Sequence, residues 1–430
     1  MAERDERLER FIELNAGSST GGVPRLRSPE RGLARLGALA LAVVVSGCGD
    51  GGGSGTSGAG SGGSPSVGTT NGTGPGATSS GAASGTANGS GGGTSSTGQA
   101  ASTGEGGTTS NGASTTGQLP EVDCENPTFV DAHLEEAIQY AAGTEPLGQL
   151  TRLIAEAEDI VSLSGIECLT GLVRLELRGN EIDDLRPLAG LEHLEVLDLD
   201  QNHVTDVGPL ANLTSLTELN LDSSYDLSEL SPLGGLVNLQ ILRISYTAVS
   251  DLTALASLTS LTYLGADSSD VADVTPLVGL PNLVELWLTA TPIPDLEAVG
   301  QLTALHELGV SGVRTLTDIS PLANLAELTN LNISYNLITD ISALASLTKL
   351  ETLGMGLNEI SDLSPLSELP LRLLYADSNQ ITDITPLVTI PTFVDGSPLD
   401  VRSNPLDCTA QAENLAALEG RGVELQSDCE

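Results

Sequence analysis

The residues that could carry catalysis are few and scattered in this chain of 430 residues. Its histidines form neither a cysteine–histidine pair nor a metal-ligand spacing: His133, His193, His203 and His306. The glycines gather in a tract that follows no predicted strand, so no phosphate-binding loop is indicated. Carboxylates such as Glu285 and Glu307 recur on what we expect to be an open sheet, where little burial is available to raise a pKa. We therefore expect no enzyme activity, no cofactor and no metal site.

The cysteines divide by position into one isolated residue and two groups. The isolated one follows an apolar run, two bracket the start of a repeated region, and two bracket its end: Cys48, Cys124, Cys168, Cys408 and Cys429. Two bridges and one special thiol is the simplest arrangement, and it requires an oxidising compartment. A cysteine nucleophile is then not expected.

The N-terminal region has the order of a secretion signal. A basic segment, residues 25–35, precedes an apolar run, residues 36–45, which is shorter than the roughly 20 residues of a membrane-spanning helix. The sequence Val45-Ser46-Gly47-Cys48 then resembles the lipobox of bacterial lipoproteins. The resemblance implies that Cys48 is lipidated and that residues 1–47 are removed as a signal peptide; an ordinary apolar segment is the alternative. Gly49 in place of aspartate favours an outer-membrane or cell-surface location in the cell envelope.

Two further segments precede the repeats. Residues 1–22 are longer than a signal peptide needs, so we hypothesise that Val23, a possible GTG codon, is the true start. Residues 48–118 are rich in Gly, Ser, Thr and Ala and nearly free of charge. Such a composition predicts a disordered tether with a mean end-to-end distance of about 45 Å.

The charge of the chain restricts its partners. The formal net charge is −40, and residues 48–430 keep 10 basic against 51 acidic side chains. This acidity repels phosphate backbones and anionic lipid headgroups, so nucleic acid is excluded and membrane attachment requires the lipid. Cationic proteins or divalent cations would be compatible partners, although the acidity also serves to keep a stacked protein soluble.

From residue 150 the chain repeats about every 22 residues, which predicts a solenoid. One unit has the pattern Leu172-x-x-Leu175-x-Leu177-x-x-Asn180-x-Ile182, followed by Leu185, Leu188 and Leu191. The alternation predicts a short strand with one buried face, and the later spacing predicts a helical or 3₁₀ return limb. Stacked units would share one apolar core.

Two polar positions recur in the repeat. An asparagine just past each strand is placed to bond the backbone of neighbouring units, and Ser or Thr replaces it in the middle units. An aspartate precedes the return limb in nine units, as Asp184 does, and Glu229 takes its place in the tenth; a proline follows three residues later in seven of these units. We interpret the aspartate as a cap of the first turn, with calcium binding as the alternative.

This pattern resembles the 22-residue leucine-rich repeats of internalin-type bacterial surface proteins. The resemblance covers residues 128–430 and implies a leucine-rich-repeat horseshoe, an α/β solenoid with a parallel concave sheet and a helical or 3₁₀ convex side. It implies a helical N-terminal cap at 119–149, repeats at 150–398 and a C-terminal cap at 399–430. Because solenoid ends expose core leucines, we expect each end to be closed by a disulfide, Cys124–Cys168 and Cys408–Cys429.

The exposed strand positions are the expected binding surface. Aromatic residues occur in three successive middle units, with charged residues nearby, and we predict ligand-binding residues there: Arg243, Tyr246, Tyr263, Asp267, Glu285 and Trp287. Trp287 lies between two leucines of a strand, so its side chain must point away from the core. Protein binding is the leading functional hypothesis. A polysaccharide-binding adhesin and a structural envelope component are the alternatives, and scattered surface aromatics are the alternative to a binding cluster.

Overall fold

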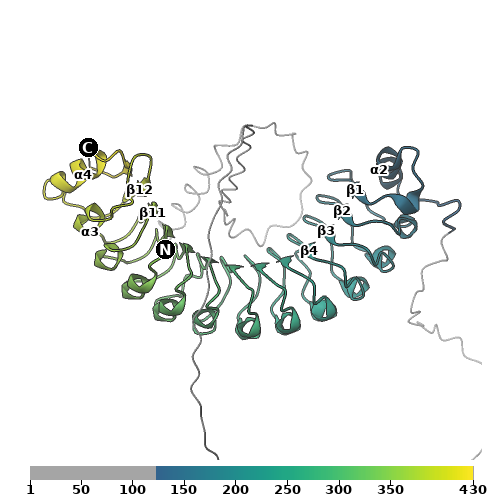
Figure 1. Cartoon of the computed structure of the whole chain (residues 1–430), viewed down its shortest axis with the longest axis horizontal. Coiled ribbons are helices and arrows are strands. Elements are labelled where there is room, and N and C mark those ends of the chain that lie inside the picture. Colours follow the sequence, from purple (N-terminus) through teal and green to yellow (C-terminus); the bar gives the residue numbers. More distant parts are fainter. Residues whose placement is uncertain (1–122, 430) are drawn as a thin grey trace, which may run out of the picture. The chain divides into compact units, whose positions relative to one another are not determined.

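The computed structural model of the chain describes residues 123–429. They form one sheet of thirteen parallel strands whose spatial order follows the sequence, so every unit pairs with the units before and after it. The strands line the inner edge of an arc, and the return limbs lie on the outer edge (Figure 1). The strands are β1 Arg152–Ile154, β2 Arg174–Glu176, β3 Val196–Asp198, β4 Glu218–Asn220, β5 Ile241–Arg243, β6 Tyr263–Gly265, β7 Glu285–Trp287, β8 Glu307–Gly309, β9 Asn330–Asn332, β10 Thr352–Gly354, β11 Leu373–Tyr375, β12 Pro398–Asp400 and β13 Glu424–Gln426. The predicted leucine-rich-repeat horseshoe is confirmed.

The return limbs are almost all 3₁₀ helices. They are η2 Leu147–Gln149, η3 Ile166–Cys168, η4 Arg186–Leu188, η5 Gly208–Leu210, η6 Ser231–Gly235, η7 Thr253–Ser257, η8 Thr275–Gly279, η9 Val299–Gln301, η10 Ser320–Asn324, η11 Ser342–Ser346 and η12 Ser364–Leu366. One limb is a short α-helix, α3 Thr385–Val388. Such short limbs allow each turn of the solenoid to close in about 22 residues.

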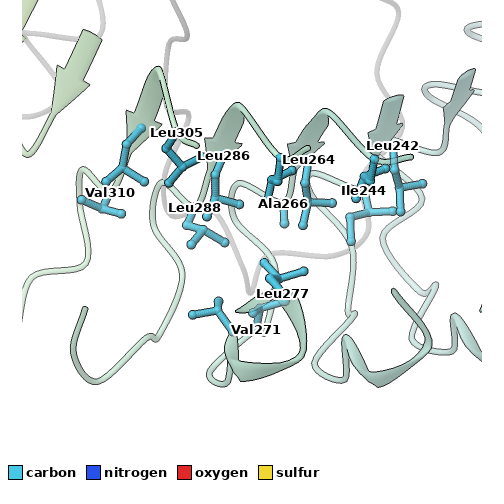
Figure 2. Packing of buried hydrophobic residues seen from close by; sticks show 14 of the residues in the cluster. Leu242, Ile244, Leu264, Ala266, Val271, Leu277, Leu286, Leu288, Leu305 and Val310 are labelled. Carbon is cyan, nitrogen blue, oxygen red and sulfur yellow. The ribbon is translucent and has the colours of Figure 1, made fainter. Parts of the chain in front are cut away.

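The core is a continuous column of leucines between the strands and the return limbs. Leu242, Leu264 and Leu286 occupy the middle of three successive strands in register, and each is fully buried. Figure 2 shows these strand residues pointing to the same interior side, with Leu277 of a return limb packed opposite. Burial of apolar area at about 25 cal/mol per Å² is the main stabilising term, and it is gained only when units stack.

The recurrent asparagines form hydrogen bonds that join one unit to the next. The Nδ2 of Asn180 donates to the carbonyls of Ala155 in the preceding unit and Leu177 in its own, each at 2.8 Å, while its Oδ1 accepts from the backbone N–H of Ile160 at 3.0 Å. Asn202, Asn336, Asn358, Asn379 and Asn404 repeat this pattern. The predicted role of the asparagine is confirmed.

The aspartate before each return limb also has the predicted role. Asp251 Oδ1 accepts from the backbone N–H of Thr253, two residues on, at 2.8 Å. Eight further aspartates do the same at the start of their limbs: Asp184, Asp206, Asp273, Asp295, Asp318, Asp340, Asp362 and Asp383. Each carboxylate thus satisfies a donor at the start of a limb that has no partner within the limb.

Both ends of the stack are covered by a helix and a disulfide. Helix α2, Ala132–Ala142, lies within the region predicted as a helical cap, begins after its N-cap Asp131 and ends at Gly143. Helix α4, Ala412–Glu419, lies at the other end beside β13. The bridges Cys124–Cys168 and Cys408–Cys429 are both formed.

The predictions for the N-terminal region lie outside the described residues. These are the signal peptide at 1–47, the start at Val23, lipidation of Cys48 and the tether at 48–118. Within residues 123–429, the longest helix is far shorter and more polar than a bilayer-spanning one.

Candidate binding surface on the inner face of the sheet

The inner face of the sheet carries three rows of side chains that run across the strands. The first row consists of the first residues of the strands, and the second row of their third residues. The third row lies two positions further on and includes Arg178, Asp200, Asp222, Ser245, Asp267 and Thr289. Because most strands, such as β2, β5 and β7, have a buried leucine between partly exposed neighbours, the first and second rows point away from the core.

In the N-terminal part of the face, charged side chains pair with one another. Glu176 of β2 is bound by Arg174 and, at 3.2 Å, by Arg152. Arg178 meets Asp200 at 3.0 Å. These arginines are therefore engaged within the chain, although each keeps between two fifths and three fifths of its side chain exposed.

Arg243 and Tyr263 lie together, as residues of one predicted site should. The guanidinium carbon of Arg243 is 4.9 Å from the centroid of the Tyr263 ring, a cation–π distance. On its other side, Arg243 Nη1 is 2.9 Å from Glu218 Oε1. The arginine is thus held between a carboxylate and an aromatic ring taken from β4 and β6.

The indole of Trp287 leans over the neighbouring strand β8 and does not stand perpendicular to its own strand, β7. A Cβ built on Gly309 would be 2.4 Å from Cε3 of Trp287, so the indole occupies the space that a side chain would need there. Gly309 is the residue of β8 in register with Trp287. The tryptophan is half-buried, so part of the ring remains open to a partner.

The third predicted aromatic residue, Tyr246, has a different setting. It follows the third row after β5 and adopts a left-handed conformation, with φ of 58°. Tyr335 occupies the same position of its own unit and has φ of 57°. The aromatic residues therefore occupy three different positions of the repeat, with Tyr263 in the first row, Trp287 in the second and Tyr246 at the edge.

Carboxylates of the middle units are withdrawn from water. Burial raises the pKa of Asp222 to about 7, against the opposing effect of a hydrogen bond from the Ser245 backbone N–H at 2.5 Å. Burial likewise raises the pKa of Asp267, whose Oδ1 accepts from the Thr289 N–H at 2.6 Å. These acids fix the backbone of the following strand, and their burial disfavours the ionised form.

Glu285 is the acid of the predicted set that stays available. Burial and then the nearby carboxylate of Glu307 raise its pKa, while Arg243 and His306 act the other way. Among residues 123–429, neither Glu285 nor Glu307 has a cationic side chain within ion-pair distance. These residues also include no cluster of three metal-binding side chains.

Beyond β8 the inner face changes from charged to polar. The first and second rows of β9 and β10 present only amides, a hydroxyl and a glycine: Asn330, Asn332, Thr352 and Gly354. Tyr375 of β11 ends this stretch and is 44% exposed. The first and second rows of the face therefore carry charged side chains up to Glu307 of β8 and none from β9 to β11, and charge returns with Asp400 of β12.

Sequence reasoning missed residues that act through the register. Glu218 holds Arg243, and Gly309 makes room for Trp287. Gly309 thereby determines how Trp287 lies. The signal was present, because equivalent positions of adjacent units, such as 287 and 309, are neighbours across the sheet.

Comparison with known proteins gives the same architecture. The family model described as "Leucine Rich repeats (2 copies)" matches residues 192–235 and 326–368, and it is a repeat and not a catalytic domain. No curated protein matches the chain.

Two solved structures from Listeria monocytogenes are similar to this chain. The internalin inlF has 32% sequence identity, with 70% of this chain and 95% of that chain covered and a TM-score of 0.59. The functional domain of InlJ, described as including a cysteine ladder, has 25% identity, covers 65% of this chain and 66% of that chain, and has a TM-score of 0.54. Since nearly the whole of inlF is matched at this identity, the chain belongs to the internalin-type leucine-rich-repeat proteins.

Proposed function

We propose that this protein binds a protein partner through the inner face of its sheet, around Tyr263 and Trp287. The observation that carries the proposal is the half-buried Trp287, which lies on a glycine of the next strand in the middle of a rigid face. A tryptophan that is already immobilised loses little conformational freedom when a partner covers it. The similarity to internalins supports a binding role and not a catalytic one.

A substitution pair tests this proposal. Trp287→Ala removes the central contact, whereas Val237→Ala removes an exposed apolar side chain that lies outside the strands, being 49% exposed. In crosslinking on intact cells, we expect one protein to be captured by the wild type and by Val237→Ala, and to be lost from Trp287→Ala. Equal capture by Trp287→Ala would show that the inner face is not the binding surface.

A neutral polysaccharide is the second candidate ligand, and one observation favours it. The uncharged amides and hydroxyl of β9 and β10 lie between the aromatic side chains of Trp287 and Tyr375, and sugars are held by stacking on aromatic rings and by hydrogen bonds. Retention on a glycan array that is lost in both Trp287→Ala and Tyr375→Ala would support this ligand. No retention of any glycan by the wild type would exclude it.

We also propose that a lipid on Cys48 anchors the protein to the outside of a bacterial membrane. The support is the sequence Val45-Ser46-Gly47-Cys48 after a short apolar run, and the disulfides require an oxidising compartment. In cells labelled with a fatty-acid analogue, the wild type should carry the label and sediment with membranes. Cys48→Ser should lose both properties, and membrane sedimentation of an unlabelled Cys48→Ser chain would refute the anchor.

A further inference from the structure

Glu285, Glu307 and Trp287 together form a group that lacks the cation for which it is suited. Glu285 and Trp287 are two residues apart on β7, so both project from the same face of the strand. Glu307 is paired in register with Glu285 on β8, about 4.8 Å away along the sheet. The indole of Trp287 leans onto the same strand β8, over Gly309. Two carboxylates and one aromatic ring therefore border a single patch of the inner face.

The chain itself shows what such a group binds. Two strands earlier, the guanidinium of Arg243 lies between the Glu218 carboxylate, at 2.9 Å, and the Tyr263 ring, at 4.9 Å. That arrangement uses the first-row position of β4 and β6, as Glu285 and Glu307 use the first-row position of β7 and β8. The second arrangement has the acids and the ring, but no arginine or lysine of residues 123–429 reaches the acids.

The electrostatics of the group point the same way. Burial and then the second negative charge of Glu307 raise the pKa of Glu285, while Arg243 and His306, which lie beyond ion-pair distance, act the other way. Asn330 Nδ2 approaches Glu307 Oε2 at 3.4 Å, which gives a weak, uncharged partner. With a formal net charge of −40, the chain as a whole attracts cations and repels anions.

We propose that the protein partner inserts an arginine or lysine side chain between Glu285 and Glu307, with its cationic group against Trp287. This inference rests on the proposed function and specifies the chemistry of the partner at that site. It predicts a partner with an exposed basic segment. It also assigns separate roles, since the carboxylates select the charge and the indole supplies contact area and cation–π attraction.

Trp287 is the only tryptophan of the chain, so its fluorescence reports on this patch alone. The probe is an acetylated, amidated peptide of alternating glycine and arginine, and its control is the same peptide with citrulline in place of arginine. Citrulline keeps the shape and hydrogen-bonding character of the side chain but carries no charge. We expect a saturable change in fluorescence with the arginine peptide and none with the citrulline peptide.

Variants then separate the carboxylates from the ring. Glu285→Gln and Glu307→Gln should each weaken peptide binding by about two- to fivefold, and the double variant should weaken it further. Glu192→Gln, an exposed residue outside the strands, should have no effect. Raising the salt to about 1 M, where the Debye length is about 3 Å, should also weaken binding. Unfolding midpoints near that of the wild type will show that the variants are folded.

The outcomes distinguish this inference from the proposed function. If Trp287→Ala loses the crosslinked partner while Glu285→Gln with Glu307→Gln retains it in full, the inner face binds a protein and the cation site is wrong. An equal response to both peptides, or no response to either, also overturns the cation site. Retention of a neutral glycan that is insensitive to the glutamine substitutions would identify a sugar as the occupant and overturn it as well.

Discussion

Asp222 is a carboxyl group that the sheet holds largely away from water. Its pKa is raised to about 7 in the folded protein by burial, whereas in the unfolded chain it would titrate near 3.8. Between these two values the folded state binds more protons than the unfolded state. The contribution of Asp222 to stability is therefore most favourable at low pH and declines as the pH rises from about 4 to about 7.

Asp222→Asn should remove this pH dependence. An amide oxygen can still accept the hydrogen bond from the Ser245 N–H, and it carries no charge to be buried. The difference in unfolding free energy between the variant and the wild type should grow in favour of the variant from about pH 4 to about pH 8. This growth should be at most about 4 kcal/mol. Urea unfolding at the two pH values measures the difference.

Asp251→Asn is the matched control for that measurement. Hydrogen bonds from Thr253 lower the pKa of Asp251, so its ionised form is favoured in the folded state. Stability from this group is present above its unfolded pKa and is lost as the pH falls. A gain at high pH in both variants would contradict the assignment of the effect to burial of Asp222.

Gly309 controls the orientation of Trp287 at the centre of the candidate site. In Gly309→Ala the new methyl group would lie 2.4 Å from Cε3, so the indole must turn away from β8. We expect red-shifted tryptophan emission, a loss of stability of about 1 kcal/mol, and weaker binding of the crosslinked partner. In Gly279→Ala the added Cβ meets nothing within 4 Å, and its emission should match that of the wild type. An unshifted spectrum for Gly309→Ala would show that the ring does not rest on this glycine.

At the scale of the structural element, the repeat position just past the strand differs along the stack. Where it is asparagine its side chain bonds the preceding unit, and where it is serine or threonine it does not. Asn358 Nδ2 donates to the carbonyl of Ile333 in the preceding unit at 2.9 Å, and its Oδ1 accepts from the Ile338 N–H at 3.0 Å. In the middle units, Thr247 donates to the carbonyl of Ile244 at 2.7 Å and accepts from the Val249 N–H at 3.4 Å, and both partners belong to its own unit. The Ser224 hydroxyl is buried without a hydrogen-bond partner. In the middle units this position therefore does not join one unit to the next, whereas Asp222 and Asp267 do so through the Ser245 and Thr289 N–H groups.

Alanine substitutions at this repeat position should lower the free energy of unfolding most where the side chain links two units and least where it has no hydrogen-bond partner. Asn358→Ala leaves buried backbone groups of two units unpaired and should cost about 2–4 kcal/mol, whereas Thr247→Ala should cost about 1 kcal/mol. Ser224→Ala removes a buried hydroxyl that has no partner and should be neutral or stabilising. Chemical denaturation of the three variants measures the order. A large loss for Ser224→Ala would mean that its hydroxyl has a bonding role.

The elements were predictable from the sequence to the extent that one unit dictates them. The alternation of Leu175 and Leu177 predicts a strand, and aspartate with proline predicts the start of a limb, because both depend on residues close in the chain. The environment of Arg243 depends on Glu218 and Tyr263, which lie in the units before and after it. Unit lengths of 22 and 23 residues shift the numbering between strands, so these contacts required the register of the sheet.

The candidate site was harder to predict than the fold for a related reason. Leucines repeat in every unit, so an error at one position leaves the architecture intact. The candidate residues occur once each, and their neighbours are set by side-chain orientation. Trp287 pointed away from the core as expected, but its inclination onto Gly309 depends on the absence of a Cβ in the next strand. A prediction made unit by unit could not include that contact.

At the scale of the whole molecule, the described residues form a one-dimensional stack whose ends must be protected separately. Each unit contacts its immediate neighbours, so the loss of an end exposes the leucines of the next unit but leaves distant units paired. The disulfides close chain segments of 44 residues at the N-terminal end and 21 at the C-terminal end. In the chain-entropy description, such loops contribute about 4 and about 3 kcal/mol.

Removing one bridge should therefore destabilise one end of the stack. In the double variant Cys408→Ser with Cys429→Ser, we expect faster amide hydrogen exchange in α4, β12 and β13, with protection retained in β5–β8. The variant Cys124→Ser with Cys168→Ser should show the reverse, with faster exchange in α2 and β1. Because the inner face around Trp287 lies several units from either end, both variants should still bind the crosslinked partner. Hydrogen exchange read by mass spectrometry measures the protection of each strand directly. A loss of protection spread evenly over all strands would mean that the stack unfolds as one cooperative unit.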